Sequence, residues 1–214
     1  MSLLRRYART PVSVRLLQSG EIERVPQTGA VASVQEAEVS IPEPLLEELW
    51  RPEYLERLGR AYWRHLQRTT LGLVRVLYTE RSRAVVLLTR RLPLLRFHAP
   101  EYEISADEGC VTWRIERGLL VAAAGREHGF LRIRVRRGEG EREPGREIVR
   151  VRLEVRNFYP WLRASGRFAR FGAWLYGQTQ LRIHVLVCNA FLRSLAGLDL
   201  PRSRVGALER PAAV

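Results

Sequence analysis

The last third of the chain joins an alternating strand pattern to a long, mostly apolar helix pattern. The strand pattern runs from Glu147 to Pro160, and the helix pattern runs from Gly166 to Gly197. The apolar helix residues fall on two stripes. The first stripe comprises Phe171, Trp174, Leu181, Val185, Cys188, Leu192 and Leu195. The second, on roughly the opposite side, comprises Tyr176, Ile183, Val187, Ala190 and Phe191. A helix that is apolar on two sides is normally covered on two sides, so we expect a sheet against the first stripe and another cover on the second.

The second cover has two candidates, the basic N-terminal segment and a second subunit. A large exposed apolar patch is unusual on a soluble monomer, so a homodimer is one of the two solutions. Within the N-terminal segment, residues 12–17 and 21–25 flank the turn formers Ser19 and Gly20 and are predicted to pair as a small hairpin. We therefore expect a basic arm over residues 1–29, a main domain over 30–200 and a tail over 201–214.

The middle of the chain predicts one strand, two helices and then a series of strands. The first strand is expected at 35–41, and the helices at 44–49 and 52–68. Further strands are expected at 71–78, 83–89, 94–98, 109–116, 118–124, 129–136 and 147–156. Because the spacers between consecutive strands are short, an antiparallel meander is favoured. The predicted fold class is therefore α+β, with an antiparallel sheet curved around one long C-terminal helix.

Composition and motifs exclude several classes of function. All 36 basic residues are arginines, against 23 acidic residues, and the absence of lysine indicates codon bias more than nucleic-acid binding. The two cysteines lack metal-ligand spacing and fit a reducing cytosol, so a cytoplasmic location is expected. The sequence has no apolar run long enough for a transmembrane segment. The four histidines are scattered and no nucleotide or hydrolase motif occurs, so no metal and no cofactor are predicted.

The order of elements from Gln35 to Gly197 resembles that of the START-like helix-grip superfamily. This superfamily includes polyketide cyclases, aromatase/cyclases and lipid-transfer proteins. The phrases RNFYPWL (156–162) and YGQTQLRIHVLVCNAFLRSL (176–195) also look like a group of uncharacterised actinobacterial proteins. The resemblance implies a cavity between the curved sheet and the long helix that holds an apolar ligand. It carries over no catalytic residue, because the superfamily has none in common.

Two groups of residues are candidate binding sites. The cavity is predicted to involve Trp174, Gln178, Leu181, Val185, His184 and Tyr62. Gln178 and His184 are candidates to orient a polar group of the ligand, or they bond to the backbone at the helix edges. An anion-binding surface is predicted from Arg132, Arg134, Arg136, Arg150, Arg152 and Arg156, which alternate with apolar residues in two strands and share one face if the strands pair.

Three functions remain open from the sequence. The first is binding of an apolar small molecule, lipid or polyketide-like, with catalytic residues unknown. The second is a scaffold that binds an anionic membrane, nucleic acid or an acidic protein through the arginine face. The third is an aromatase/cyclase-type enzyme. An apolar void of several hundred Å³ would favour the first function, and a filled interior would favour the second.

Overall fold

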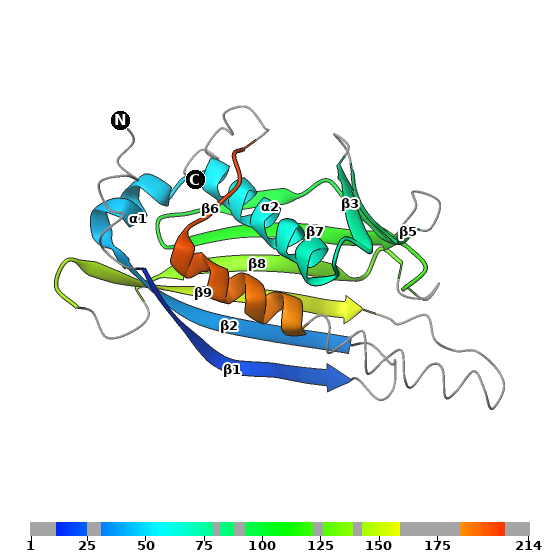
Figure 1. The fold of residues 1–214 in the computed structure, drawn as a ribbon, viewed down its shortest axis with the longest axis horizontal. Coiled ribbons are helices and arrows are strands. Elements are labelled where there is room, and N and C mark those ends of the chain that lie inside the picture. The colour runs from blue at the N-terminus through cyan, green and yellow to red at the C-terminus, as the bar shows by residue number, and fades with distance from the viewer. Residues whose placement is uncertain are drawn as a thin grey trace.

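The computed structural model describes residues 12–24, 31–78, 82–87, 93–121, 126–138, 143–158 and 185–203. Within these residues, the helices lie on one face of a single antiparallel sheet (Figure 1). Helix α1 (Glu43–Leu49) and helix α2 (Pro52–Thr69) follow the second strand. The C-terminal helix is described over 185–194 and continues into the short 3-10 turn η3 (Leu195–Gly197). The fold is therefore α+β, of the helix-grip type.

The sheet places the beginning and the end of the main domain side by side. Its strands are β1 (Ser13–Arg24), β2 (Val31–Pro42), β3 (Val74–Tyr78), β4 (Ser82–Leu87), β5 (Pro93–His98), β6 (Glu101–Ile104), β7 (Glu108–Arg117), β8 (Phe130–Arg137) and β9 (Arg146–Phe158). Their order is β1-β2-β9-β8-β7-β5-β4-β3, and β6 pairs with β7. The pairing of β5 with β7 joins the meanders β3–β4–β5 and β7–β8–β9, and the pairing of β2 with β9 adds β1 and β2, so the strands form one continuous surface on which the helices rest.

Alternation of side chains decides which face of the sheet is internal. In β2, Ala37, Val39 and Ile41 are buried, whereas Glu36 and Glu38 between them point to the other face. The partner strand β9 repeats the pattern, with its valines 149 and 151 and its leucine 153 buried. The register aligns the buried positions of the two strands, since Ala37 lies opposite Val151. The inner face is thus an apolar floor for the helices.

The C-terminal helix is wedged between this floor and α2. Val187, Cys188, Phe191 and Leu192 are fully buried, while Leu186 is 59% exposed. At about 100° per residue, the four buried residues fall within one arc of about 140°. The prediction of two opposite apolar stripes was therefore wrong over 185–194, where the helix has one broad buried side. The residues before 185 that belong to these stripes lie outside the described residues.

Helix α2 covers the outer part of that buried side. The Phe191 ring packs edge-on against Tyr62 of α2, with centroids 5.6 Å apart, and lies 6.2 Å from the His65 ring. Part of the cover that the sequence assigned to residues 1–29 or to a partner is thus supplied within the main domain, and β1 also contacts the end of this helix at η3. The argument for a homodimer from an uncovered stripe does not apply to the described part of this helix.

The predicted elements between β2 and β9 are largely confirmed, with three corrections. Residues 13–24 form one continuous strand that pairs with β2, so the predicted hairpin of 12–17 with 21–25 was wrong. The segment Glu101–Ile104 is a strand, although no strand was predicted there. Residues 118–120 form a turn, where the sequence predicted a strand. The limits of the arm, domain and tail stay a prediction, although β1 extends the sheet.

Candidate functional site

Aromatic side chains fill the interior between α2 and the sheet. Trp63 of α2 lies 5.3 Å from Trp113 of β7 and 5.5 Å from Phe97 of β5, measured between ring centroids. Tyr62 stands edge-on to Trp63 at 5.0 Å. A Cβ atom on Gly59 would lie 2.7 Å from the Trp113 ring, so this glycine lets the indole rest against the helix backbone. Among the described residues, this part of the interior is packed core.

An apolar pocket lies at the other end of the interior, beneath α1 and the start of α2. Its volume is about 100 Å³. Its walls come from α1, α2, β2, β6, β7, β8, β9 and the segment after the C-terminal helix. They comprise Val39, Ile41, Leu46, Leu49, Trp50, Arg51, Tyr54, Leu55, Leu58, Ile104, Gly109, Val135, Val149, Val151, Leu195, Leu198 and Leu200. No carboxylate or imidazole is among these lining residues of the described chain.

The few polar groups of the pocket come from the connection between α1 and α2. The Trp50 indole N–H donates to the Ser105 carbonyl oxygen at 2.9 Å, which fixes the ring. Arg51 is exposed, and its guanidinium forms no ion pair within the described part of the chain. The Tyr54 ring carries the Arg57 guanidinium 4.5 Å from its centroid. The pocket is therefore apolar inside and has a cationic group among its polar wall residues.

A short C-terminal segment closes one side of the pocket. Leu195, Leu198 and Leu200 form this wall, and Leu198 has a positive φ of 45°. Two arginines of α2 hold the segment by its backbone. Arg57 Nε donates to the Pro201 carbonyl oxygen at 2.8 Å, and Arg64 donates to both the carbonyl and the carboxylate of Asp199. This segment, residues 195–203, is called the strap below. Polar contacts on its outer side hold it in place.

Two buried polar side chains on the inner face of β2 have no hydrogen-bond partner. The amide of Gln35 is 1% exposed and the hydroxyl-bearing Ser33 is 2% exposed. Neither the Gln35 amide oxygen and nitrogen nor the Ser33 oxygen has a partner within the described chain. A buried polar group without a partner costs about 1–3 kcal/mol, so such groups are rare in an interior that is fully packed. Sequence patterning did not single out these two residues.

The predicted cavity residues are only partly covered by the structure. Trp174, Gln178, Leu181 and His184 lie outside the described residues, so their role stays a prediction. Tyr62 is 4% exposed and belongs to the aromatic core, where burial and Cys188 raise the pKa of its phenol. Val185 is half-buried on the C-terminal helix. Neither of them lines the apolar pocket.

The six arginines of the predicted anion-binding surface share one face of the β8–β9 hairpin. Arg134 lies opposite Arg152, and Arg136 lies opposite Arg150. Five of the six pair with a glutamate of the same face. The pairs are Arg134 and Arg136 with Glu108, Arg150 with Glu38, Arg152 with Glu36, and Arg156 with Glu154. Arg132 donates to the Thr112 hydroxyl at 3.0 Å and lies over the Phe130 ring.

The compensating anions of this face are thus supplied by the sheet itself. The sequence placed six arginines against one glutamate because it considered only β8 and β9. The neighbouring strands add Glu36 and Glu38 from β2 and Glu108 from β7. Exposed ion pairs of this kind contribute about 0–1 kcal/mol each, but they remove most of the excess charge that a polyanion would seek.

Comparisons with known proteins found only remote structural similarities. No family model and no curated protein sequence matches the chain. Similar solved structures include the conserved protein of unknown function EF2215 from Enterococcus faecalis, with 11% identity, TM-score 0.29 and coverage of 87% of this chain and 82% of that one. CalU16 from Micromonospora echinospora has 12% identity, TM-score 0.29 and coverage of 96% and 87%. Norcoclaurine synthase from Thalictrum flavum, solved with dopamine and hydroxybenzaldehyde, has 12% identity, TM-score 0.28 and coverage of 88% and 99%.

At these identities and TM-scores, the comparisons carry no conclusion about a ligand or an activity. The description as helix-grip rests on the strand order and on the C-terminal helix. Within the described residues, no helix is long and apolar enough to cross a membrane. The same residues hold no group of three or more side chains suited to binding a metal ion.

Proposed function

We propose that this chain is a START-like module that binds a small apolar molecule, lipid or polyketide-like, on the inner face of its sheet. The observation that carries the proposal is the apolar pocket beneath α1 and α2. A volume of about 100 Å³ is below the roughly 300–1,000 Å³ of drug-sized ligand sites. The pocket therefore suits a single ring or a short alkyl group, which is the apolar end of a larger ligand.

The polar wall residues support a ligand with a polar or anionic end. Arg51 is exposed and has no ion pair in the described chain, so its guanidinium is available for a carboxylate. The unpartnered Gln35 and Ser33 side chains provide further hydrogen-bonding groups on the same sheet face. Catalysis is not part of the proposal, because the pocket wall offers no carboxylate or imidazole among its described residues.

Native mass spectrometry of freshly purified protein tests this function and does not require the ligand to be identified first. A mass increment that disappears on denaturation is the expected result. As a defined probe, phenylacetate should shift the NMR signals of the pocket residues. Val135→Phe should abolish these shifts because the larger side chain fills the pocket.

A matched control is Val155→Phe, which places the same bulk on the inner face of β9 at a residue that does not line the pocket. This variant should keep the response to phenylacetate. Equal responses in the two folded variants, or no response in the wild-type protein together with no co-purifying molecule, would overturn the proposed function.

A further inference from the structure

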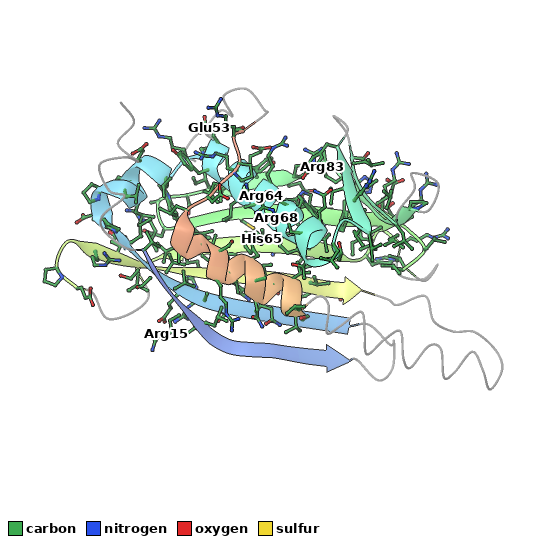
Figure 2. The ribbon with its side chains drawn as sticks, viewed as in Figure 1. Arg15, Glu53, Arg64, His65, Arg68 and Arg83 are labelled. Atoms are coloured by element: carbon green, nitrogen blue, oxygen red, sulfur yellow. The ribbon has the colours of Figure 1, made fainter. Side chains whose placement is uncertain are left out.

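A second concave region lies on the outer side of α2, between this helix, β3 and the end of the C-terminal strap. Its volume is about 620 Å³, within the range of small-molecule sites. The groove is lined by Arg60, Arg64, Gln67, Tyr78, Pro201, Arg202 and Ser203. The groove and the apolar pocket share no lining residue, although the strap borders both of them. Figure 2 shows Arg64 and Arg68 along α2, with Arg83 towards β3.

Positive charge gathers along this groove. Arg57, Arg60, Arg64 and Arg68 recur at spacings of three, four and four residues, which places them on one stripe of α2. Arg202 adds a fifth guanidinium from the strap. Among the described residues, these five arginines form ion pairs with two carboxylates, namely Glu56 with Arg60 and Asp199 with Arg64. The groove therefore carries an excess of positive charge.

Tyr78 brings another arginine to the edge of the groove. The guanidinium carbons of Arg60 and Arg83 each lie 4.9 Å from the centroid of the Tyr78 ring. The two positive charges are thus within about 10 Å of each other, close to the screening length at physiological salt.

Arg64 is the group best prepared to receive such an anion. One terminal nitrogen of its guanidinium binds the Asp199 carboxylate at 3.0 Å, while its buried Nε has no partner in the described chain. Because Nε is closed to solvent, an incoming oxyanion would be bound by the terminal nitrogens of Arg64, one of which now holds Asp199. The Asp199 side chain is 74% exposed, so this ion pair is weak and readily exchanged.

We propose that the groove binds a phosphorylated small molecule, with the phosphate or diphosphate group on Arg64 in place of the Asp199 carboxylate. Arg60 and Arg202 line the same groove and add charge-assisted contacts to the remaining phosphate oxygens. Guanidinium groups suit phosphate because they present several donors in a fixed plane. Tyr78, a residue that is 39% exposed, borders the same groove.

Isothermal titration of the full chain with pyrophosphate at low ionic strength tests the site. Arg64→Gln should weaken binding about tenfold, and Arg202→Gln should weaken it severalfold, because each removes a charged donor. Asp199→Asn should strengthen binding severalfold, because it removes the competing carboxylate. Arg114→Gln on β7 is the matched control, because Arg114 pairs with Glu101 and lines neither the groove nor the arginine face of β8 and β9, and it should change affinity less than about twofold.

Asp199→Asn is expected to raise the affinity for pyrophosphate, whereas Arg64→Gln is expected to lower it. If Arg64→Gln folds poorly, the affinity of Asp199→Asn still tests the proposal. Weaker or unchanged binding in folded Asp199→Asn would overturn the proposal. So would an equal loss in Arg114→Gln, which would indicate unspecific attraction by net charge. Binding of the protein to phosphatidic acid vesicles, if pyrophosphate competes with it, would support the same phosphate site. In that case a lipid headgroup would supply the phosphate. Vesicle binding that pyrophosphate leaves unchanged, with no heat from pyrophosphate alone, would overturn it.

His65 provides an independent reporter of where the anion binds. Burial, then Arg64 and Arg68, lower the pKa of this imidazole, and Asp199 opposes them. Pyrophosphate on Arg64 should raise the pKa of His65, as followed by NMR of the ring protons with His65→Gln for assignment. An unchanged His65 pKa at saturating pyrophosphate would place the anion elsewhere and overturn the proposal.

Discussion

The Phe191 ring of the C-terminal helix stands perpendicular to the Tyr62 ring of α2, with an interplanar angle of 88° and centroids 5.6 Å apart. Phe191 is fully buried, and Tyr62 in turn contacts Trp63, which reaches Trp113 of the sheet. This chain of edge-on rings connects the C-terminal helix to α2 and α2 to the sheet. One series of packed aromatic rings therefore connects the C-terminal helix, α2 and the sheet.

Replacing Phe191 by Ala should remove the outer end of this series of rings and leave a cavity. Such substitutions in a core cost about 3–5 kcal/mol. Urea denaturation monitored by circular dichroism should show the loss as a lower midpoint. Leu186→Ala on the same helix is the control, because that side chain is 59% exposed and should be nearly neutral. A loss of less than about 1 kcal/mol in Phe191→Ala would contradict the assignment of Phe191 to the core.

The sequence was sufficient to predict the helices and strands whose own residues show a clear pattern. Pro52 at the start of α2 and the alternation of β8 and β9 each identify their element without reference to the rest of the chain. β6 was missed because its alternating pattern is only four residues long, Glu101–Ile104, and its strand structure depends on pairing with β7. Tertiary pairing of this kind is not visible in a single short segment.

The candidate sites were harder to predict because they depend on elements that are distant in the sequence. The glutamates that neutralise the arginine face come from β2 and β7, so the pattern of β8 and β9 alone suggested a free cationic surface. The groove of Arg64 is completed by Arg202, which is 138 residues further along the chain. The sequence pattern of α2 shows its arginine stripe, but it does not show which segment lies opposite.

Removal of residues 1–29 tests the contribution of β1 to the sheet. β1 pairs with β2 over most of its length, from Ser13 opposite Ser40 to Arg24 opposite Val31. Its loss would expose the backbone edge of β2, which is a template for pairing with another chain. The truncated protein should melt at a lower temperature and elute earlier on size-exclusion chromatography. Unchanged melting and elution would mean that β1 is dispensable for the domain.

Charge reversal on the outer face tests whether the arginines retain any attraction for polyanions. We expect weak, salt-sensitive retention on heparin or anionic liposomes, because exposed charges are screened over about 8 Å at physiological salt. The double variant Arg134→Glu and Arg152→Glu should reduce this retention with the fold intact. If a folded double variant elutes from heparin at the same salt concentration as the wild type, the face has no role in binding anions.

Glu38 should make the stability of the sheet depend on pH at its β1–β2–β9 edge. The hydrogen bond from Arg15 lowers the pKa of Glu38 below its ordinary value of 4.5, burial opposes this shift, and the Arg15 charge and Arg150 add to it. Because the pKa of the folded state is depressed, the stabilisation is present above pH 4.5 and is lost as the pH falls through the folded-state pKa. Glu38→Gln should therefore lower the melting temperature at pH 7, and the difference from wild type should shrink steadily below pH 4.5. A difference that stays constant down to about pH 2 would show that the Glu38 charge does not contribute to folding stability.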